Sequence, residues 1–299
     1  MEIKIDENII SFNELKVQSY KGLTIIPLET EISNATDFLT LKKGFDLGLV
    51  EVKECEVEDV NNVIITNNAV TPLILIDGEE IIGAKQNRIV NRTVIVPPKT
   101  TMKISVSCTE RGRWSYKNNH FCDFEQSDYI ANSNTRRAKA SALDEQSIQD
   151  NVWYSIDNFS HRCSIQPKTS AMVDCYEDFS QYQDEYLDYF KLSNNQTGLI
   201  AIIDNEIIGV EIFTNPEIYE NYHDKIIRSY IIDSIDFKAN DSVDDDKINE
   251  IIENISKSEF IKEKSQGLGE FIKFSNNYGT GTALIYDDEI IHMPYFKDL

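Results

Sequence analysis

The sequence has few of the residues that usually mark metal sites and disulfide frameworks. Its five cysteines, at positions 55, 108, 122, 163 and 175, are odd in number and show no CxxC spacing, and its four histidines are scattered. A disulfide framework or a His/Cys zinc site is therefore not expected, whereas free thiols are. We predict no metal site, and the cofactor, if the protein uses one, stays unknown at this stage.

Long hydrophobic runs are also missing. No apolar run approaches the roughly 18 residues that a membrane-spanning helix needs, and the opening Met1-Glu2-Ile3-Lys4 is not typical of a signal peptide. We therefore expect a cytoplasmic protein with no membrane partner. The chain has 299 residues, 41% of them apolar and 27% charged, which is typical of a globular protein with a substantial core.

Positive charge is scarce, and it is unevenly distributed. The formal net charge is -22, and a field of this sign repels extended nucleic acid and anionic membranes. Residues 81–139 nevertheless hold eleven Lys or Arg against four acids, a local balance of +7. Close donors in this window could hold a small anion, because they outweigh a screened distant field. Pairing with the surrounding acidic surface would account for the same cations.

The pattern of apolar residues predicts an α+β fold. Residues 1–128 are mostly short runs rich in Ile and Val, separated by turn residues, which is typical of strands. Thr36 is expected to cap one short helix before a strand over residues 49–52. We therefore expect a β-rich N-terminal half with hairpins. Residues 1–299 are predicted to form a single domain, with a sub-division at 131/132 as the alternative.

After Asn132 the apolar period becomes helical. Ser133 or Asn134 is expected to cap a first helix, Thr169 or Ser170 starts a second, and Asn215-Pro216-Glu217 is a strong start signal for a third. A further helix is expected around residues 248–255, before the final strands. These helices are predicted to pack on a mixed or antiparallel sheet in the C-terminal half.

Three segments share the pattern of a tight hairpin. They are "ILIDGEEIIG", "IIDNEIIG" and "LIYDDEIIH", with Asp-Gly, Asp-Asn and Asp-Asp as the turn pairs. Only the first continues into Lys85-Gln86-Asn87-Arg88, so this polar tetrad is not part of the hairpin pattern. If it continues a strand, Lys85 and Asn87 lie on one face and Gln86 and Arg88 on the other. A charged edge strand is the alternative to a binding segment.

A second polar cluster lies in "VSCTERGRWSYKNNHF", residues 106–121. Its arginines suit bidentate recognition of phosphate, and Trp114 can stack on a base. Cys108 beside two arginines could be an activated nucleophile, although a cysteine after an apolar strand is more often a buried filler. The candidates for acid–base chemistry are Glu79 or Glu80, His120 and His292.

These motifs resemble one known family. The runs "LIDGEEIIGAKQNRIVNRTVIVP", "ISVSCTERGRW" and "IIGVEIFTNPEIYENYHDKIIRSYIIDSID" are similar to the uncharacterised prokaryotic domain family associated with ADP-ribosylglycohydrolases and rhodanese-phosphatases. The resemblance covers nearly the whole chain and implies one fold from end to end. It also implies a setting in ADP-ribose or NAD-derived nucleotide metabolism, often linked to bacterial defence against phages. The positions that match the family motifs are Lys85, Asn87, Arg88, Cys108, Glu110, Gly112, Arg113 and Trp114.

Two hypotheses follow. In the first, the protein binds or processes a small anionic nucleotide related to ADP-ribose, as a ligand-binding protein or a hydrolase. Lys85, Arg88 and Arg113 then hold the diphosphate, with Trp114 as the stacking surface. Gln86 and Asn87 fix the ribose or base, and Glu110 orients an arginine. The candidate catalytic residues are Glu80, Cys108 and His292.

In the second hypothesis, the chain is a non-catalytic interaction or scaffold module that docks a protein partner or a second copy of itself. The polar motifs then form an internal network that braces the β region, with Arg88 and Glu110 paired. The two hypotheses differ in geometry, because a ligand site requires residues 85–88 and 108–114 to lie on adjacent strands and open into one pocket.

Overall fold

The Ile- and Val-rich runs form the strands that the sequence predicts, and helices occupy mainly the C-terminal half. The computed structural model describes residues 1–31, 36–55, 57, 59–115, 124–142, 144–237 and 244–298. The α+β prediction is confirmed, since three sheets are combined with helices in the described residues. Pairing is antiparallel throughout the sheets except between β5 and β8, which run parallel.

The chain divides into two compact units, each built from segments on both sides of residue 131. Unit 1 contains residues 1–36, 182–265 and 269–299, and unit 2 contains residues 37–181 and 266–268. Each unit is described separately below. The single family-wide domain stays a prediction.

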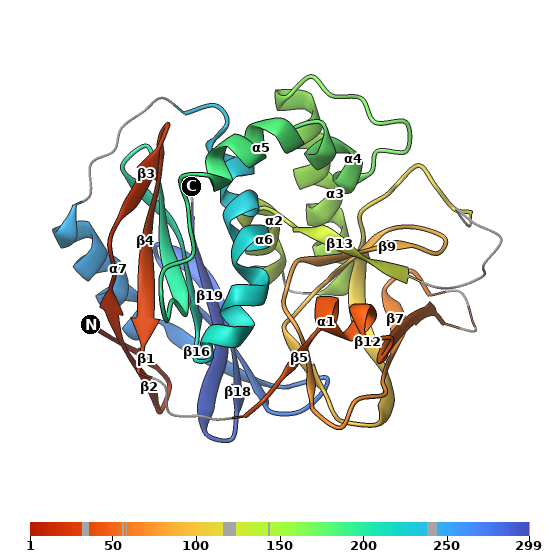
Figure 1. Cartoon of the computed structure of the whole chain (residues 1–299), viewed down its shortest axis with the longest axis horizontal. Coiled ribbons are helices and arrows are strands. Elements are labelled where there is room, and N and C mark those ends of the chain that lie inside the picture. Colours follow the sequence, from red (N-terminus) through yellow and green to blue (C-terminus); the bar gives the residue numbers. More distant parts are fainter. Residues whose placement is uncertain are drawn as a thin grey trace. The chain divides into compact units, whose positions relative to one another are not determined.

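Unit 1 is built on one ten-stranded antiparallel sheet. In spatial order its strands are β1 (Glu2–Ile5), β2 (Asn8–Glu14), β4 (Leu23–Thr30), β14 (Gly198–Ile203), β15 (Glu206–Phe213), β19 (Glu289–Lys297), β18 (Gly279–Tyr286), β17 (Glu270–Asn276) and β16 (Glu259–Lys264), with β3 (Gln18–Tyr20) on β4. Strands distant in sequence, such as β4 and β14, are neighbours in space (Figure 1).

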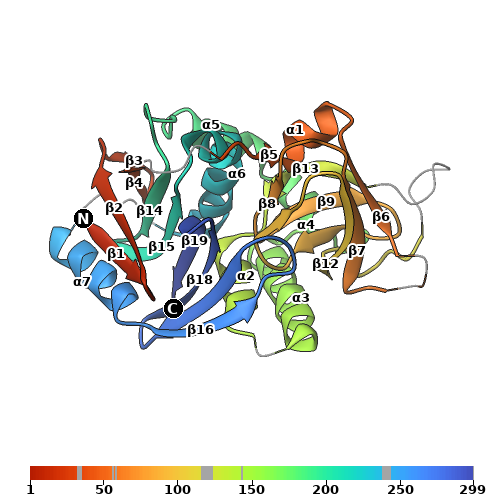
Figure 2. The same cartoon turned by 90° about the horizontal axis from the view of Figure 1, so that it is seen from below.

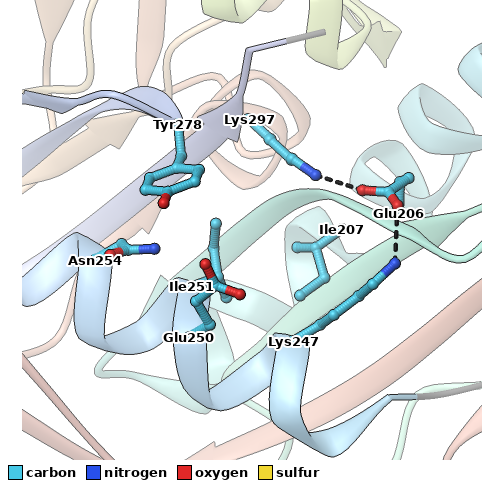
Figure 3. Close-up of a pocket in the computed structure, with 8 residues that line it drawn as sticks. All are labelled: Glu206, Ile207, Lys247, Glu250, Ile251, Asn254, Tyr278 and Lys297. Carbon is cyan, nitrogen blue, oxygen red and sulfur yellow. Dashed lines mark hydrogen bonds and ion pairs between the residues drawn. The ribbon is translucent and has the colours of Figure 1, made fainter.

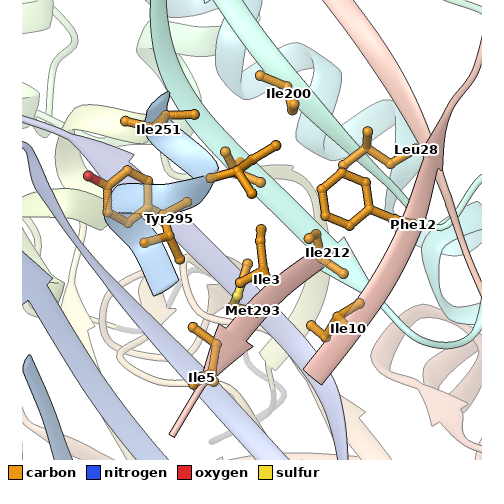
Figure 4. Close-up of a cluster of buried hydrophobic side chains, with 14 of the residues drawn as sticks. Ile3, Ile5, Ile10, Phe12, Leu28, Ile200, Ile212, Ile251, Met293 and Tyr295 are labelled. Carbon is orange, nitrogen blue, oxygen red and sulfur yellow. The ribbon is translucent and has the colours of Figure 1, made fainter. Parts of the chain in front are cut away.

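Successive side chains of a strand point to opposite faces, so each face of this sheet needs its own cover. On one face, Ile200 and Ile212 join an apolar cluster with Phe12 and Met293 (Figure 4). Helix α7 (Asp245–Ser256) closes this cluster with its buried isoleucines and lies against β1 (Figure 2). Helix α6 (Pro216–Ser234) packs against β4, β14 and β15.

Unit 2 carries two smaller sheets. The six-stranded sheet has the order β13 (Phe124–Ile130), β9 (Glu79–Gly83), β10 (Arg88–Val90), β12 (Thr100–Cys108), β7 (Asn62–Asn67) and β6 (Val50–Glu54). The three-stranded sheet has the order β11 (Val94–Val96), β8 (Leu73–Leu75) and β5 (Leu39–Thr40). One apolar cluster, which includes Val63, Leu75 and Val106, draws residues from both sheets.

The remaining helices are short, apart from α3. They are α1 (Leu41–Asp46), α2 (Ser133–Ala140), α3 (Glu145–Arg162), α4 (Met172–Glu177) and α5 (Ser180–Leu187). None of the helices in the described residues is long and apolar enough to cross a membrane.

Two of the three expected hairpins are confirmed. β14 and β15 pair across Asp204-Asn205, and β18 and β19 pair across Asp287-Asp288, with positive φ at all four turn residues. The prediction of a hairpin at Asp77-Gly78 is wrong, because β8 and β9 do not pair with each other. β8 pairs with β11 and β5, whereas β9 pairs with β10 and β13. The Asp-Gly turn is therefore a corner at which the chain passes from one sheet to another.

Several helix starts differ from the prediction. The expected first helix is two helices, and their caps are Asn132 for α2 and Asp144 for α3. The helix expected from Thr36 begins after Thr40, and α4 follows Ala171 rather than Thr169 or Ser170. The start at Asn215-Pro216 is confirmed, because the Asn215 side chain accepts hydrogen bonds from the N–H groups of Glu217 and Ile218.

Candidate functional site

The two polar motifs lie side by side in unit 2. Arg88 of β10 is the direct antiparallel neighbour of Cys108 of β12, and the carbonyl of Asn87 accepts a hydrogen bond from the Thr109 N–H. The alternation of side chains proposed from the sequence assumed that residues 84–87 continue a strand. They do not. They form the tight connection between β9 and β10, with positive φ at Gly83 and Ala84.

Arg113 joins the two motifs. Its Nη1 donates to the carbonyl oxygens of Ala84 at 2.7 Å and Ser115 at 2.6 Å, and its Nη2 donates to the carbonyl of Gly83 at 3.0 Å. This guanidinium therefore holds the β9–β10 connection against the segment that follows Gly112. Gly112 itself is required there, because a Cβ on it would meet the Thr169 backbone at 2.9 Å.

Glu110 is the anion at the centre of this network. Its Oε2 accepts from Arg113 Nη2 at 2.5 Å and from the Asn87 N–H at 3.2 Å, and its Oε1 accepts from Thr169 Oγ1 at 2.9 Å. Burial alone would raise the pKa of Glu110, but the hydrogen bonds from Arg113 and Thr169 hold it below its ordinary value. The proposed pairing of Glu110 with Arg88 is wrong, since its partner is Arg113.

Arg88 points into the core of unit 2. It lies on the same face of β10 as Val90, and its cross-strand neighbour Ile81 belongs to the apolar cluster of this unit. The side chain is 0% exposed, and burial lowers its pKa. Nη1 donates to Gln86 Oε1 at 3.0 Å, and the carboxylate of Glu54 forms a long ion pair with Nη2 at 3.9 Å.

Other polar side-chain atoms of the motifs form hydrogen bonds within the protein. The Gln86 side-chain amide donates to the Glu110 carbonyl at 3.0 Å, and Asn87 Oδ1 accepts from Arg113 and from the Gly83 N–H. By contrast, four buried nitrogens of the motif side chains have no hydrogen-bond partner among the described residues. They are Asn87 Nδ2, Arg88 Nε, Arg88 Nη2 and Arg113 Nε.

The half-buried Lys85 and the exposed Trp114 form one side of the network. The Lys85 ammonium lies 5.1 Å from the centroid of the Trp114 ring, and Trp114 is 44% exposed. Lys85 is held by its backbone. The Lys85 N–H donates to Glu54 Oε1, and the Lys85 carbonyl accepts from the Ser115 N–H. A cation beside an exposed aromatic ring can bind a base and an attached phosphate.

The candidate catalytic residues lie in different surroundings. Glu80 is buried and accepts hydroxyl hydrogen bonds from Thr109 at 2.9 Å and Ser127 at 3.0 Å. Cys108 is also buried, which raises the pKa of its thiol, while the charge of Arg88 and the Glu110 N–H at 3.4 Å act in the opposite direction. A thiol in this state is mostly protonated and is a weak nucleophile.

His292 belongs to unit 1 and so is not part of this network. It is buried, stacks on Phe213 at 4.3 Å, and lies 3.3 Å from Glu211 Oε2. Glu211 also accepts from the Tyr230 hydroxyl, so these residues form a polar cluster between the sheet and α6. His120 lies outside the described residues.

A hollow on unit 1 was not anticipated from the sequence. It has a volume of about 140 Å³, and the Glu206 carboxylate at one end bridges Lys247 and Lys297 (Figure 3). Tyr278 and Asn254 lie at the other end. The sequence did not predict this hollow, because Glu206, Lys247 and Lys297 are far apart in the chain and belong to no motif. No group of His, Cys, Asp and Glu suited to a metal ion occurs among the described residues.

The comparisons with known proteins yield one family. No curated protein and no solved structure matches the chain. A family model does match, over residues 12–296, and it describes a domain associated with ARG, the ADP-ribosylglycohydrolases, and with the rhodanese-phosphatase superfamily. This association gives the protein an ADP-ribose-related context. Since the match covers nearly the whole chain and includes both motifs, the chain belongs to the family of the ARG and Rhodanese-Phosphatase-superfamily-associated Protein domain.

Proposed function

We propose that the protein binds a small anionic nucleotide related to ADP-ribose on the surface formed by Lys85 and Trp114. The observation that carries the proposal is the placement of the Lys85 ammonium 5.1 Å from the ring of the exposed Trp114. A base stacks on such a ring, and the ammonium attracts the phosphates attached to it. The ADP-ribose-related context of the family supports this ligand class.

The buried network supports this proposal by keeping the surface fixed. Arg113 binds carbonyls on both sides, those of Gly83 and Ala84 before Lys85 and that of Ser115 after Trp114. A site that is fixed before binding loses less conformational entropy when the ligand arrives. In this scheme Glu110 and Arg113 position the surface, which revises the diphosphate-holding role first suggested for Arg113.

Calorimetry with ADP-ribose and NAD tests the proposal. Trp114→Ala removes the stacking surface, and Lys85→Ala removes the cation. Trp114→Ala should weaken binding by about 5- to 150-fold, since stacking on an aromatic ring contributes roughly 1–3 kcal/mol per base. Lys85→Ala should also weaken binding, because the phosphates lose a cation. Neither side chain belongs to the core, so both variants should keep the melting temperature of the wild type.

A matched control is available in the same unit. Tyr154 is an exposed aromatic residue on α3, and Tyr154→Ala should leave binding unchanged. Failure of the wild type to bind any of these nucleotides would refute the proposal. Equal losses in Trp114→Ala and Tyr154→Ala would refute the assigned surface.

A second function, that of a non-catalytic interaction module, is favoured by a different observation. Most of the hydrogen-bonding groups of Arg113 and Glu110 bind other groups of the protein itself. If the motifs only brace unit 2, a partner protein binds elsewhere. Trp114→Ala and Lys85→Ala would then leave partner binding intact, and no nucleotide would bind.

A further inference from the structure

Arg88 is a buried arginine whose main recognition edge is not used by the described residues. The Nε–H and one Nη2–H of a guanidinium point in the same direction and together form a fork that fits two oxygens of one oxyanion. In Arg88 both Nε and Nη2 are buried and lack hydrogen-bond partners among the described residues. A buried donor without a partner costs free energy, because it has given up its hydrogen bonds to water.

A second buried arginine in the same unit shows how this edge is normally satisfied. Arg136 on α2 is also 0% exposed, and its Nε and Nη2 donate to the two carboxylate oxygens of Asp77 at 2.9 and 2.8 Å. Asp77 thus supplies the two parallel acceptors that the fork requires. The two arginines have the same burial and the same chemistry, but only Arg136 has a bidentate partner.

The hydrogen-bonding groups left unused around Arg88 suit an acceptor such as an oxyanion. Glu54 Oε1 lies 3.9 Å from Nη2, beyond hydrogen-bond distance, and also accepts from the Lys85 N–H. Besides burial, the guanidinium of Arg113 lowers the pKa of Arg88, whereas Cys108, Glu54 and Glu110 act in the opposite direction. Asn87 contributes the unpartnered donor Nδ2. The unused hydrogen-bonding capacity of Asn87, Arg88 and Arg113 therefore consists of donors.

We propose that the Nε–Nη2 edge of Arg88 is an inner binding site for one oxyanion, a phosphate or carboxylate group, held by two parallel N–H···O hydrogen bonds. The ligand takes the place that Asp77 occupies on Arg136. Since Arg88 is fully buried, an anion can reach it only when the surrounding structure opens, and binding is slow. Arg88 is not part of the Lys85–Trp114 surface, so this site goes beyond the proposed function.

Nuclear magnetic resonance of the arginine side chains tests the site in the intact wild-type protein. The Nε–H signals of Arg88 and Arg136 are assigned with Arg88→Lys and Arg136→Lys. Inorganic phosphate is then added, and acetate in a separate titration, each up to tens of millimolar. Phosphate or acetate should shift the Arg88 signal, in slow exchange, and leave the Arg136 signal in place. The anion that acts at lower concentration identifies the class.

Glu54→Gln provides a variant that leaves Arg88 intact. The amide keeps the acceptor for the Lys85 N–H but removes the negative charge beside Nη2, so phosphate or acetate should bind about 10-fold more tightly. The inference is overturned if the Arg88 signal does not move, if both arginine signals move equally, or if Glu54→Gln weakens binding.

A shift with phosphate but no ADP-ribose binding would support this site and refute the proposed function. ADP-ribose binding with an unmoved Arg88 signal would do the reverse.

Discussion

At the residue scale, Lys139 on α2 is the most unusual cation in unit 2. It is buried, and its ammonium nitrogen lies 2.8 Å from the carbonyl oxygen of Val90. Its pKa is lowered from 10.5 to about 7, chiefly by burial; the charge of Asp77 acts against this shift, and the charge of Arg136 adds to it. A buried ammonium that sheds its proton near neutral pH links the stability of the protein to pH.

The sign of this link can be worked out. Between pH 7 and pH 10.5 the unfolded chain holds a proton on Lys139 that the folded chain has lost. The free energy of unfolding therefore rises with pH across this window, because the unfolded state binds more protons. Below pH 7 both states are protonated, and the cost of the buried charge stays constant.

Replacement of Lys139 by methionine should remove this dependence. We expect Lys139→Met to stabilise the protein most at pH 6.5, by up to a few kcal/mol, and progressively less toward pH 9.5. Urea unfolding of both proteins at several pH values measures the difference. Cysteines and tyrosines that titrate in the same range are shared by the two proteins, so they cancel. Parallel stability curves would contradict the low pKa.

At the element scale, one side chain fastens α3 to the end of β12. Gln149 accepts the Cys108 N–H at 2.8 Å and donates to the Cys108 carbonyl at 3.0 Å, as a neighbouring strand would. It therefore satisfies two buried backbone groups beside the motif residues. Without the amide these groups would be left buried and unpaired.

Gln149→Leu should accordingly lower the free energy of unfolding by about 2–4 kcal/mol, since two buried backbone groups lose their partners. Gln146→Leu is the matched control, because Gln146 is exposed on the same helix and its side-chain amide donates to Asp150. The control should change stability by less than about 0.5 kcal/mol. Equal effects in urea unfolding would show that the Gln149 amide does not fasten the helix.

The outcome at Asp77-Gly78 shows what the sequence could and could not predict. Turn residues predict the local backbone conformation, and Gly78 does have positive φ. The partner of each strand is decided by distant segments, and here β8 and β9 join different sheets. Asp77, explained from the sequence by its turn alone, is the bidentate partner of Arg136, which lies 59 residues further along the chain.

The same limit applies to the candidate site. Both motifs were predictable as unusual, because residue types such as Arg88 and Trp114 stand out beside ordinary hairpin continuations. Whether such a residue is buried was not predictable. Arg88 and Glu110 proved to be interior residues, whereas Trp114 is exposed. Helix starts were predicted well only where a cap, a proline and an acid coincide, as at Asn215.

At the scale of the whole molecule, charge is the dominant property. The formal net charge of -22 produces self-repulsion that the folded state concentrates in a smaller volume than the unfolded chain does. Many ion pairs partly offset this repulsion, but most are exposed, such as Lys21–Glu185, and exposed pairs contribute little. Screening by salt should therefore weaken repulsion more than attraction.

The melting temperature at pH 7.5 should accordingly rise by several degrees as sodium chloride increases from low to physiological concentration. The control is the same titration near pH 5, because the isoelectric point is about 4.5 and little net charge remains to be screened. The salt dependence should be much smaller there. A melting temperature that falls with salt at pH 7.5 would mean that attractive pairs outweigh the net repulsion.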